Sequence, residues 1–303
     1  MPGRPGRSPS PPADAPSSTL RSVRASVNIF AAQDCQTKWR GICCRLCDPG
    51  EASRMTVRRL PFDGAVNLRD LGGYPLPSGG ETAWRRVYRA DSLAELTDAD
   101  LGRLEALGLF GLVDFRLPEE RAKKPDRLPE AHGLKLVLAG FLPRGTQDML
   151  RAVAEGRLPP EEIRAEVLRH YRLFPQEHLP DYAAMFRLLI EADGRPALIH
   201  CTSGKDRTGF GAALLLRAAG VSEDAIAEDY ALTNTYRRDI RFMFGPDVSP
   251  EALDMLTSAH PEYIRTALEE LERQHPEPDS WLEAMGLDAA ERRAARRLLS
   301  PEP

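Results

Sequence analysis

The sequence predicts an α/β fold in which a parallel sheet is covered by helices on both faces. Short apolar runs that suit buried strands alternate with longer segments of helical periodicity. The chain has 303 residues, of which 42% are hydrophobic and 28% are charged, as in ordinary globular proteins. This length allows one large domain or two modest ones, and the composition excludes collagen, coiled-coil rods and fully disordered chains.

Residues 1–54 differ from the remainder of the chain. They carry 8 Lys and Arg against 4 Asp and Glu, whereas the other 249 residues carry 33 and 41. The first 20 residues are rich in Pro, Ser, Arg and Gly and cannot bury enough surface to fold, so we expect disorder there. Because Thr56–Leu60 is a sensible domain start, we expect translation to begin at Met55, with residues 1–54 annotated in error. N-terminal mass spectrometry of the native protein would then find no peptide from them.

Charge, hydropathy and cysteine usage exclude several classes of function. The net charge of −4 argues against a protein that binds nucleic acid through general phosphate attraction. No stretch approaches the roughly 20 apolar residues of a membrane span, and no secretory signal is present. A cytoplasmic location is therefore expected, with secretion by another route left open. Four of the five cysteines lie before residue 48, and their spacing lacks the second ligand pair of a zinc site, so neither disulfides, a metal nor a cofactor is expected.

The first predicted elements are a strand and a helix. Ala83–Ala90 reads as a strand because it follows the turn Ser78–Gly80. The next helix should begin after Thr97, a favourable N-cap residue that is followed by two aspartates in the first turn. Gly108 suits the position just past its end.

The central part of the chain combines apolar runs with a long helical stretch. Leu109–Phe115 predicts a buried strand, and Leu134–Leu138 predicts a weaker one. Residues 146–193 look helical, with breaks expected at Pro159–Pro160 and between Pro175 and Pro180.

The last part of the chain begins with a strand and is otherwise helical. Ala197–His200 is apolar enough for a buried strand. A helix over Arg207–Ala219 is apolar on nearly all sides and should lie in the core, ending at Gly220. Ser222 should cap the next helix, and further helices should fill residues 250–300.

The chemistry is concentrated where the last predicted strand passes into a helix, in His200-Cys201-Thr202-Ser203-Gly204-Lys205-Asp206-Arg207-Thr208-Gly209. Free backbone amides and the helix dipole make such a junction an anion site. Six positions separate Cys201 from Arg207, so the loop between them can curl with its amides around a phosphate, and Gly204 and Gly209 permit the tight turn. Phosphate-binding residues are expected to be Thr202, Ser203, Gly204, Lys205, Arg207, Thr208 and Gly209.

Cys201 is the predicted nucleophile. The loop amides, the helix N-terminus and Arg207 all favour a thiolate at the floor of this loop. The thiolate would attack phosphorus, the substrate oxygen would leave, and water would then hydrolyse the cysteinyl-phosphate. The hydroxyl of Thr208 could donate to the sulfur and make it a better leaving group. No metal is needed because the loop itself screens the phosphate charge.

The segment resembles the signature loop of the cysteine-dependent protein tyrosine phosphatases, and more narrowly that of the bacterial PtpB-like or LipA-like tyrosine and lipid phosphatases. Weaker matches to this subgroup are Asn67–Gly73, Tyr88–Leu93, Val113–Arg116 with Glu120, and Asp229-Tyr230. The resemblance implies a mostly parallel sheet of about four or five strands in one domain over residues 55–303. It also implies activity on phosphotyrosine, with phosphoserine, phosphothreonine and phosphoinositides as further substrates, and a helical lid near residues 145–175. Plain core helices are the alternative for that segment.

The proton donor is less obvious from the sequence, because no WPD-like tripeptide is present. Asp206 is the usual candidate in this subgroup, and Asp114 at a strand end is the second. Lys205 and Arg207 favour the charged form of Asp206, whereas a dianionic substrate favours the protonated form that an acid needs. Lys205 would also suit substrates with several phosphates.

Supporting roles are expected for His200, Arg69 and Asp70. His200 should orient the cysteine loop through hydrogen bonds, although it could be a packed strand residue. Arg69 and Asp70 could equally form a surface ion pair. Asp229 is expected to give structural support only.

The sequence therefore predicts a metal-independent phosphatase of phosphotyrosine with broad specificity, binding phosphate or vanadate in the loop. A phosphoinositide phosphatase is the alternative within the same chemistry. A phosphate-binding module without turnover is the third reading, but it usually lacks the cysteine or the arginine, and Cys201 and Arg207 are both present.

Overall fold

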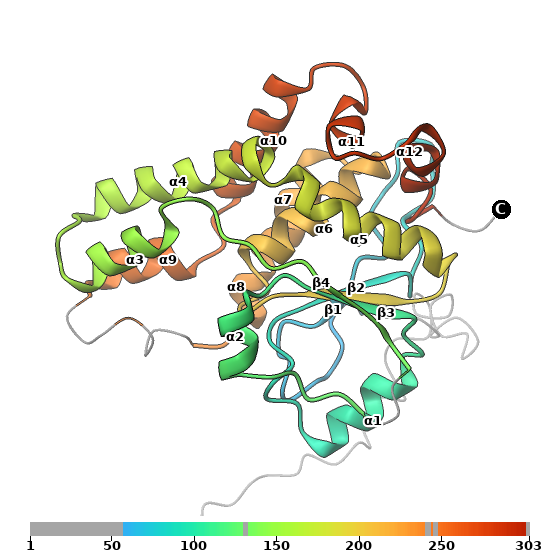
Figure 1. Cartoon of the computed structure of the whole chain (residues 1–303), viewed down its shortest axis with the longest axis horizontal. Coiled ribbons are helices and arrows are strands. Elements are labelled where there is room, and N and C mark those ends of the chain that lie inside the picture. The colour runs from blue at the N-terminus through green and yellow to red at the C-terminus, as the bar shows by residue number, and fades with distance from the viewer. Residues whose placement is uncertain (1–56, 130–132, 240–243, 245–247, 301–303) are drawn as a thin grey trace, which may run out of the picture. The chain divides into compact units, whose positions relative to one another are not determined.

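A five-stranded sheet forms the centre of the protein in the computed structural model, which describes residues 57–129, 133–239, 244 and 248–300 (Figure 1). The strand order is β1-β2-β5-β3-β4. All neighbouring pairs are parallel except β1 with β2. The bounds are β1 Arg69–Asp70, β2 Val87–Ala90, β3 Gly111–Asp114, β4 Lys135–Leu138 and β5 Ala197–His200. The predicted α/β class and the mostly parallel sheet are confirmed.

Helices cover both faces of this sheet, as expected. In Figure 1, α1 lies below the sheet, and α5 and α6 lie above it. The helices are α1 Asp98–Ala106, α2 Pro118–Lys123, α3 Thr146–Ala154, α4 Pro160–Glu177, α5 Leu179–Ala192, α6 Asp206–Ala218, α7 Glu223–Ala231, α8 Thr233–Tyr236, α9 Pro250–Thr257, α10 Pro261–Gln274, α11 Ser280–Ala284 and α12 Ala289–Ala295.

Alternate residues of the strands supply two separate apolar cores. In β5, Ala197 and Ile199 belong to the large core under the upper helices, whereas Leu198 belongs to the smaller core that includes Leu104 of α1. Side chains of a strand alternate between the two faces, so four residues are enough to contribute to both cores. Burial on both faces fixes β5 at the centre of the sheet, and the loop that follows it is held in place by its neighbours.

The strands are shorter than the apolar runs that predict them. The strand expected at Ala83–Ala90 begins only at Val87, because Arg85 adopts a left-handed conformation with φ of 61° that ends the extended backbone. The run Leu109–Phe115 gives β3, Gly111–Asp114. The predicted strand Ala197–His200 matches β5 at both ends.

Capping residues place the helix ends well. Thr97 caps α1 by accepting a hydrogen bond from the amide of Asp100, and Ser222 caps α7 in the same way. Gly108 and Gly220 take positive φ values of 61° and 84° just past their helices. These predictions from single residues are confirmed.

The helical stretch 146–193 divides into α3, α4 and α5. The breaks expected at Pro159–Pro160 and between Pro175 and Pro180 are both confirmed, the second at His178 between α4 and α5. Pro175 itself lies inside α4, because it removes only one backbone hydrogen bond near the end of a long helix whose buried face continues through Phe174. A lid over residues 145–175 stays a prediction.

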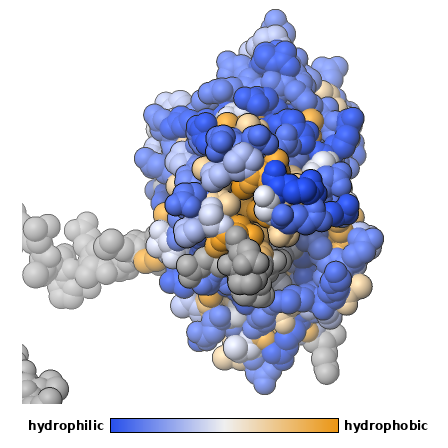
Figure 2. Space-filling view, turned by 90° about the vertical axis from the view of Figure 1, so that its left-hand side faces the viewer, coloured by the Kyte–Doolittle hydropathy of each residue, from blue (hydrophilic) through white to orange (hydrophobic). Residues whose placement is uncertain are grey.

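The molecular surface on the side of α3 and α9 carries an apolar strip between hydrophilic side chains (Figure 2). Leu150 of α3 is one of the large apolar side chains that remain exposed. No helix within the described residues is both long and apolar enough to cross a membrane. Residues 56–303 form one compact unit. The expectations for residues 1–54 lie outside the described residues.

Candidate active site

The loop from Cys201 to Lys205 joins the carboxyl end of β5 to the N-terminus of α6. Because β5 lies between β2 and β3, the loop is bordered by the carboxyl ends of three parallel strands. Ligands of open parallel sheets bind at this edge. The predicted site residues are thus brought to the place where the fold can hold an anion.

Three carbonyl groups of this loop accept hydrogen bonds from residues outside it. Thr202, Ser203 and Gly204 receive them, respectively, from Ser92 N (3.1 Å), Asn67 Nδ2 (3.2 Å) and Arg89 Nη2 (2.6 Å). In a trans peptide the N–H points opposite to the C=O. Because the three carbonyls are held outward, the amides that follow them are directed toward the inside of the loop. This is the arrangement that a phosphate cradle requires.

Gly204 is the residue on which the loop turns. Its φ is +67°, a region that side chains with a Cβ rarely adopt. A Cβ at this position would also lie 2.7 Å from the carbonyl oxygen of Ala90. Glycine is therefore required here for two independent reasons. At Gly209, a Cβ would lie 3.0 Å from the ring of Tyr230, so this glycine allows α6 to approach α7 closely.

Cys201 and Arg207 lie at the two ends of the curled loop, both buried. Cys201 is a free thiol with 1% of its surface exposed. Burial lowers the pKa of Arg207, but its hydrogen bond to Glu120 and the charge of a Cys201 thiolate outweigh burial and raise this pKa above its ordinary value. The residues that the sequence predicts for attack and for phosphate binding therefore both border this loop.

Glu120 of α2 holds the guanidinium of Arg207 with both carboxylate oxygens. Nη1 donates to Oε2 at 2.6 Å and Nη2 donates to Oε1 at 2.9 Å. Thr202 also donates its hydroxyl to Glu120. Burial raises the pKa of Glu120, but the hydrogen bond and charge of Arg207 outweigh it and lower the pKa to about 2. The sequence matched Glu120 only as part of a motif and did not show that it orients Arg207.

Asp206 and Asp114, the two candidate acids, have different surroundings. Asp206 is the first residue of α6, its side chain is 41% exposed, and its Oδ1 accepts a hydrogen bond from the hydroxyl of Tyr171 at 2.6 Å. Asp114 is 1% exposed and pairs with Arg116, whose Nη2 lies 2.9 Å from Oδ2. A substrate can therefore reach Asp206 but not Asp114.

Lys205 and Thr208 do not make the contacts that the sequence suggests for them. Lys205 is buried, and its Nζ donates to the carbonyl oxygen of Leu256 at 2.6 Å, near the end of α9, instead of facing the inside of the loop. The Thr208 hydroxyl is buried and has no hydrogen-bond partner among the described residues, so donation to Cys201 is not formed in this structure.

The imidazole of His200 faces two carboxylates rather than the cysteine loop. Nε2 lies 3.3 Å from Asp126 Oδ2 and 3.7 Å from Asp114 Oδ1. The ligand atoms of these three residues lie within 4.8 Å of one another, a geometry that could hold a metal ion. However, Arg116 Nη2 lies 2.9 Å from Asp114 and 2.7 Å from Asp126, so a guanidinium already bridges the two carboxylates. The set fits a buried ion-pair network better than a metal site.

Arg69 and Asp70 are both buried, so the alternative of a surface ion pair between them is wrong. Arg69 donates to Asp229 Oδ1 at 3.0 Å, and Asp229 also pairs with Arg89, which in turn bonds the Gly204 carbonyl. Asp70 accepts from the amides of Gly72 and Arg85 and so stabilises the turn before β2. The pairing of Arg69 with Asp229 of α7 joins residues 160 positions apart, so the local sequence does not reveal it.

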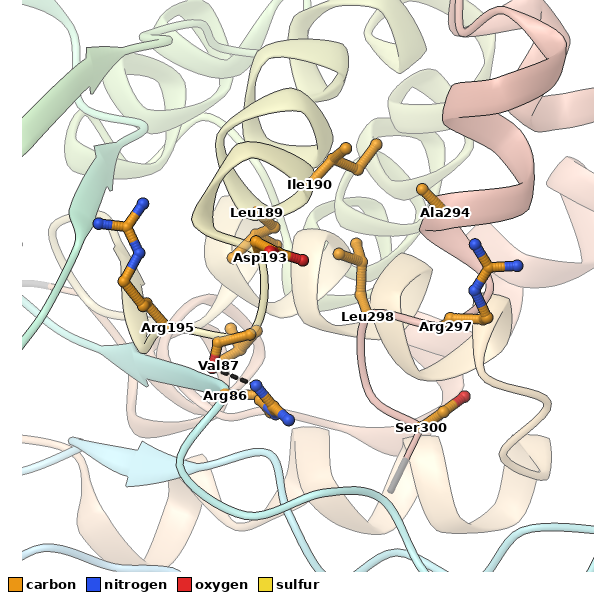
Figure 3. Close-up of a pocket in the computed structure, with 11 residues that line it drawn as sticks. Arg86, Val87, Leu189, Ile190, Asp193, Arg195, Ala294, Arg297, Leu298 and Ser300 are labelled. Carbon is orange, nitrogen blue, oxygen red and sulfur yellow. Dashed lines mark hydrogen bonds between the residues drawn. The ribbon is translucent and has the colours of Figure 1, made fainter. Parts of the chain in front are cut away.

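The structure also contains a cavity of about 380 Å³ at the opposite end of the sheet (Figure 3). It lies beside the amino ends of β2 and β5, far from Cys201 along both strands, and three arginines line it. Arg86 and Arg195 donate to carbonyl oxygens of Gly194 and Ala192 at the end of α5. These arginines cap a helix, and the cavity is separate from the phosphate loop.

Comparison with known proteins gives several matches to phosphatases. A model of the tyrosine phosphatase family matches residues 60–300. A protein of Cupriavidus necator named as a tyrosine-protein phosphatase is 33% identical over 254 residues, covering 81% of this chain and 90% of the relative. The triple specificity protein phosphatase PtpB of Mycobacterium tuberculosis is 28% identical over 280 residues, covering 78% and 96%.

Two solved structures are also similar to parts of the chain. Pseudomonas aeruginosa TpbA in complex with phosphotyrosine has a TM-score of 0.36 and 18% identity, covering 78% of this chain and 100% of that one. The catalytic domain of the PP-IP phosphatase SIW14 from Saccharomyces cerevisiae, in complex with citrate, has a TM-score of 0.32 and 15% identity, covering 71% and 94%.

Proposed function

The chain belongs to the tyrosine phosphatase family, and from this premise we propose that its Cys201 loop hydrolyses phosphotyrosine through a cysteinyl-phosphate. The observation that carries the proposal is the loop itself. Its carbonyls are tied outward, its amides are directed inward, and it runs from buried Cys201 at the end of β5 to buried Arg207 in the first turn of α6. We place residues 55–303 in one phosphatase domain.

The reaction has two steps on this loop. Cys201 Sγ attacks phosphorus, the bond from phosphorus to the substrate oxygen breaks, and the departing oxygen takes a proton from Asp206. A water molecule then attacks the cysteinyl-phosphate and loses its proton to Asp206 while the sulfur–phosphorus bond breaks. Inorganic phosphate leaves and the thiolate is restored. The loop amides and Arg207 stabilise the charge that develops on the phosphoryl oxygens in both steps.

Asp206 is favoured over Asp114 as the proton donor. Its carboxyl group is partly exposed at the start of α6, whereas that of Asp114 is buried against Arg116. A general acid must come within hydrogen-bond reach of the leaving oxygen. In this proposal Asp114 takes no part in proton transfer and belongs, with His200, to the buried ion-pair network around Arg116.

A phosphoinositide phosphatase is the second candidate, and the cations beside the loop favour it. Lys205, Arg237 and Arg238 line a small cavity together with Thr202, Ser203 and Asp91. Lys205 there bonds the Leu256 carbonyl, and Arg238 pairs with Asp91 at 3.1 Å. In this candidate function, a second phosphate of the substrate would replace one of these protein partners of Lys205 or Arg238. Relative turnover of a phosphotyrosine peptide and inositol phospholipid headgroups distinguishes the two candidates.

The test is hydrolysis of p-nitrophenyl phosphate and of a phosphotyrosine peptide in EDTA. The wild type should be active, and orthovanadate should inhibit it. Cys201→Ser should lower kcat more than about a thousandfold, and Arg207→Lys by about a hundredfold or more, with both variants folded. A Cys201→Ser variant of unchanged activity would refute the nucleophile. Absence of turnover of any phosphomonoester by the wild type would favour the binding module.

A further inference from the structure

Two buried tyrosine hydroxyls stand in line behind Asp206. Tyr171 of α4 is 2% exposed, and its hydroxyl donates to Asp206 Oδ1 at 2.6 Å. The hydroxyl of Tyr230 in α7, also buried, forms a hydrogen bond with that of Tyr171. A phenol has a single hydrogen to donate. Because the Tyr171 hydroxyl donates its one hydrogen to Asp206, Tyr230 must be the donor in the hydrogen bond between the two phenols. The chain of hydrogen bonds therefore runs from Tyr230 through Tyr171 to the carboxylate of Asp206.

These tyrosines can donate hydrogen bonds but cannot themselves supply the proton of the reaction. Burial, with the negative charge of Asp206 as the next cause, raises the pKa of Tyr171 and of Tyr230 well above the ordinary value. Both phenols therefore stay neutral under the conditions in which the enzyme would work. Their effect on chemistry must pass through the carboxyl group that Tyr171 touches.

The ring of Tyr171 is held rigidly, so its hydroxyl has a fixed direction. It packs against Phe174 and Tyr263, each with ring centroids 5.4 Å away, and against Tyr230 at 6.1 Å. A carboxyl group on the partly exposed first turn of a helix would otherwise rotate between several orientations. The hydroxyl selects the orientations in which Oδ1 faces the core.

We propose that Tyr171 is a positioning residue that binds Oδ1 of Asp206, so that Oδ2 carries the proton toward the leaving oxygen. The inference rests on the proposed function, in which Asp206 is the acid. The proton sits on Oδ2 because Oδ1 already accepts from Tyr171 and lies 3.4 Å from the charged Nζ of Lys205. After the proton has left, the same hydrogen bond stabilises the ionised carboxylate, which is the form that can accept a proton from water in the second step.

The experiment measures kcat/KM for a series of aryl phosphates whose leaving phenols differ in pKa. This constant reports the steps up to the first chemical step, where the acid acts only when the leaving group is poor. Tyr171→Phe keeps the ring and removes the hydroxyl. It should lower kcat/KM for phenyl phosphate about tenfold, as expected for loss of a hydrogen bond to a charged group, and leave that for 2,4-dinitrophenyl phosphate nearly unchanged. Tyr230→Phe should act in the same direction with a smaller loss.

A matched control and a double mutant make the result specific. Tyr263→Phe removes another hydroxyl from the same aromatic group, one that donates to the Met255 carbonyl at 3.1 Å. This control variant should leave kcat/KM unchanged for both phenyl phosphate and 2,4-dinitrophenyl phosphate. In an Asp206→Asn background, Tyr171→Phe should cause no further loss. Equal losses for good and poor leaving groups, or a further loss in the Asp206→Asn background, would overturn the positioning role and leave the proposed function intact. If Asp206→Asn itself shows no dependence on the leaving group, the acid is misassigned and the inference fails with it.

Discussion

Both terminal nitrogens of Arg207 are bound by Glu120, so the guanidinium that would grip a phosphate is held in one orientation beforehand. Nη1 also donates to the carbonyl oxygens of Phe115 at 2.8 Å and of Phe141 at 3.4 Å. A nearly buried cation is costly without a counter-charge, and Glu120 supplies that charge when the loop holds no phosphate. Fixing the arginine before binding reduces the conformational entropy that the substrate must offset.

Asp229 also serves as the counter-charge of buried arginines, at a position that is more deeply buried than Glu120. It is the shared counter-charge of Arg69 and Arg89, all three being buried. Asp229→Asn keeps the shape but leaves two guanidinium groups without their carboxylate, so we expect the free energy of unfolding in urea to fall by about 3–5 kcal/mol. The matched control is Asp224→Asn, whose carboxyl pairs with Arg265 on the surface and is 82% exposed. That variant should unfold like the wild type, and equal losses in both would contradict the assignment.

At the scale of elements, the junction of β5 with α6 depends on one glycine. Gly204→Ala would force a Cβ against the Ala90 carbonyl at a positive φ, so the loop should shift and its amides should lose their common direction. We expect kcat/KM for p-nitrophenyl phosphate to fall at least about a hundredfold. Gly220→Ala is the control, because Gly220 also has a positive φ but no contact closer than 3.7 Å. It should cost about 1 kcal/mol of stability and no activity. Full activity of Gly204→Ala would show that the loop tolerates the shift.

Elements with a local cause could be predicted from the sequence. Thr97 and Ser222 cap their helices through bonds to amides three residues away, and such a signal lies within one turn of chain. The strand Ala197–His200 was also bounded correctly, because it is short, apolar and central. By contrast, the predicted strand Ala83–Ala90 is four residues longer than β2, since no glycine marks the left-handed turn at Arg85.

Contacts between distant elements could not be predicted in the same way. Tyr171 meets Asp206 across 35 residues, Glu120 meets Arg207 across 87, and Arg69 meets Asp229 across 160. Each partner is an ordinary residue in its own helix or strand, and only the packing of α2, α4 and α7 around the loop gives it a role. The loop from Cys201 to Arg207 could be recognised because its parts lie within seven positions.

At the scale of the whole molecule, buried carboxyl groups differ in what offsets the cost of burying their charge: a guanidinium in some cases and backbone amides in others. Glu120 has a guanidinium beside it, which lowers its pKa to about 2 in spite of burial. Asp70 is also buried, but its hydrogen bonds come from backbone amides, and burial raises its pKa to about 6. The first group stabilises the fold when it is ionised, and the second when it is protonated. The two therefore give stability opposite dependences on pH.

This division predicts how the free energy of unfolding changes with pH. The ordinary pKa of Asp70 is 3.8, so the folded state binds its proton more tightly than the unfolded state does. The stability that this proton contributes is complete below pH 4 and is lost as the pH rises through about 6. The free energy of unfolding in urea should be measured at pH 4 and at pH 7 for the wild type and for Asp70→Asn, which cannot titrate at this position. Between pH 4 and pH 7, the wild type should lose about 2–3 kcal/mol more of this free energy than the variant does. Glu120→Gln should show the opposite sign, since the wild type loses its advantage over that variant as the pH falls from 4.5 toward 2. A difference between wild type and Asp70→Asn that stays constant from pH 4 to 7 would mean that Asp70 is ionised throughout, with the amides of Gly72 and Arg85 sufficient to compensate its burial.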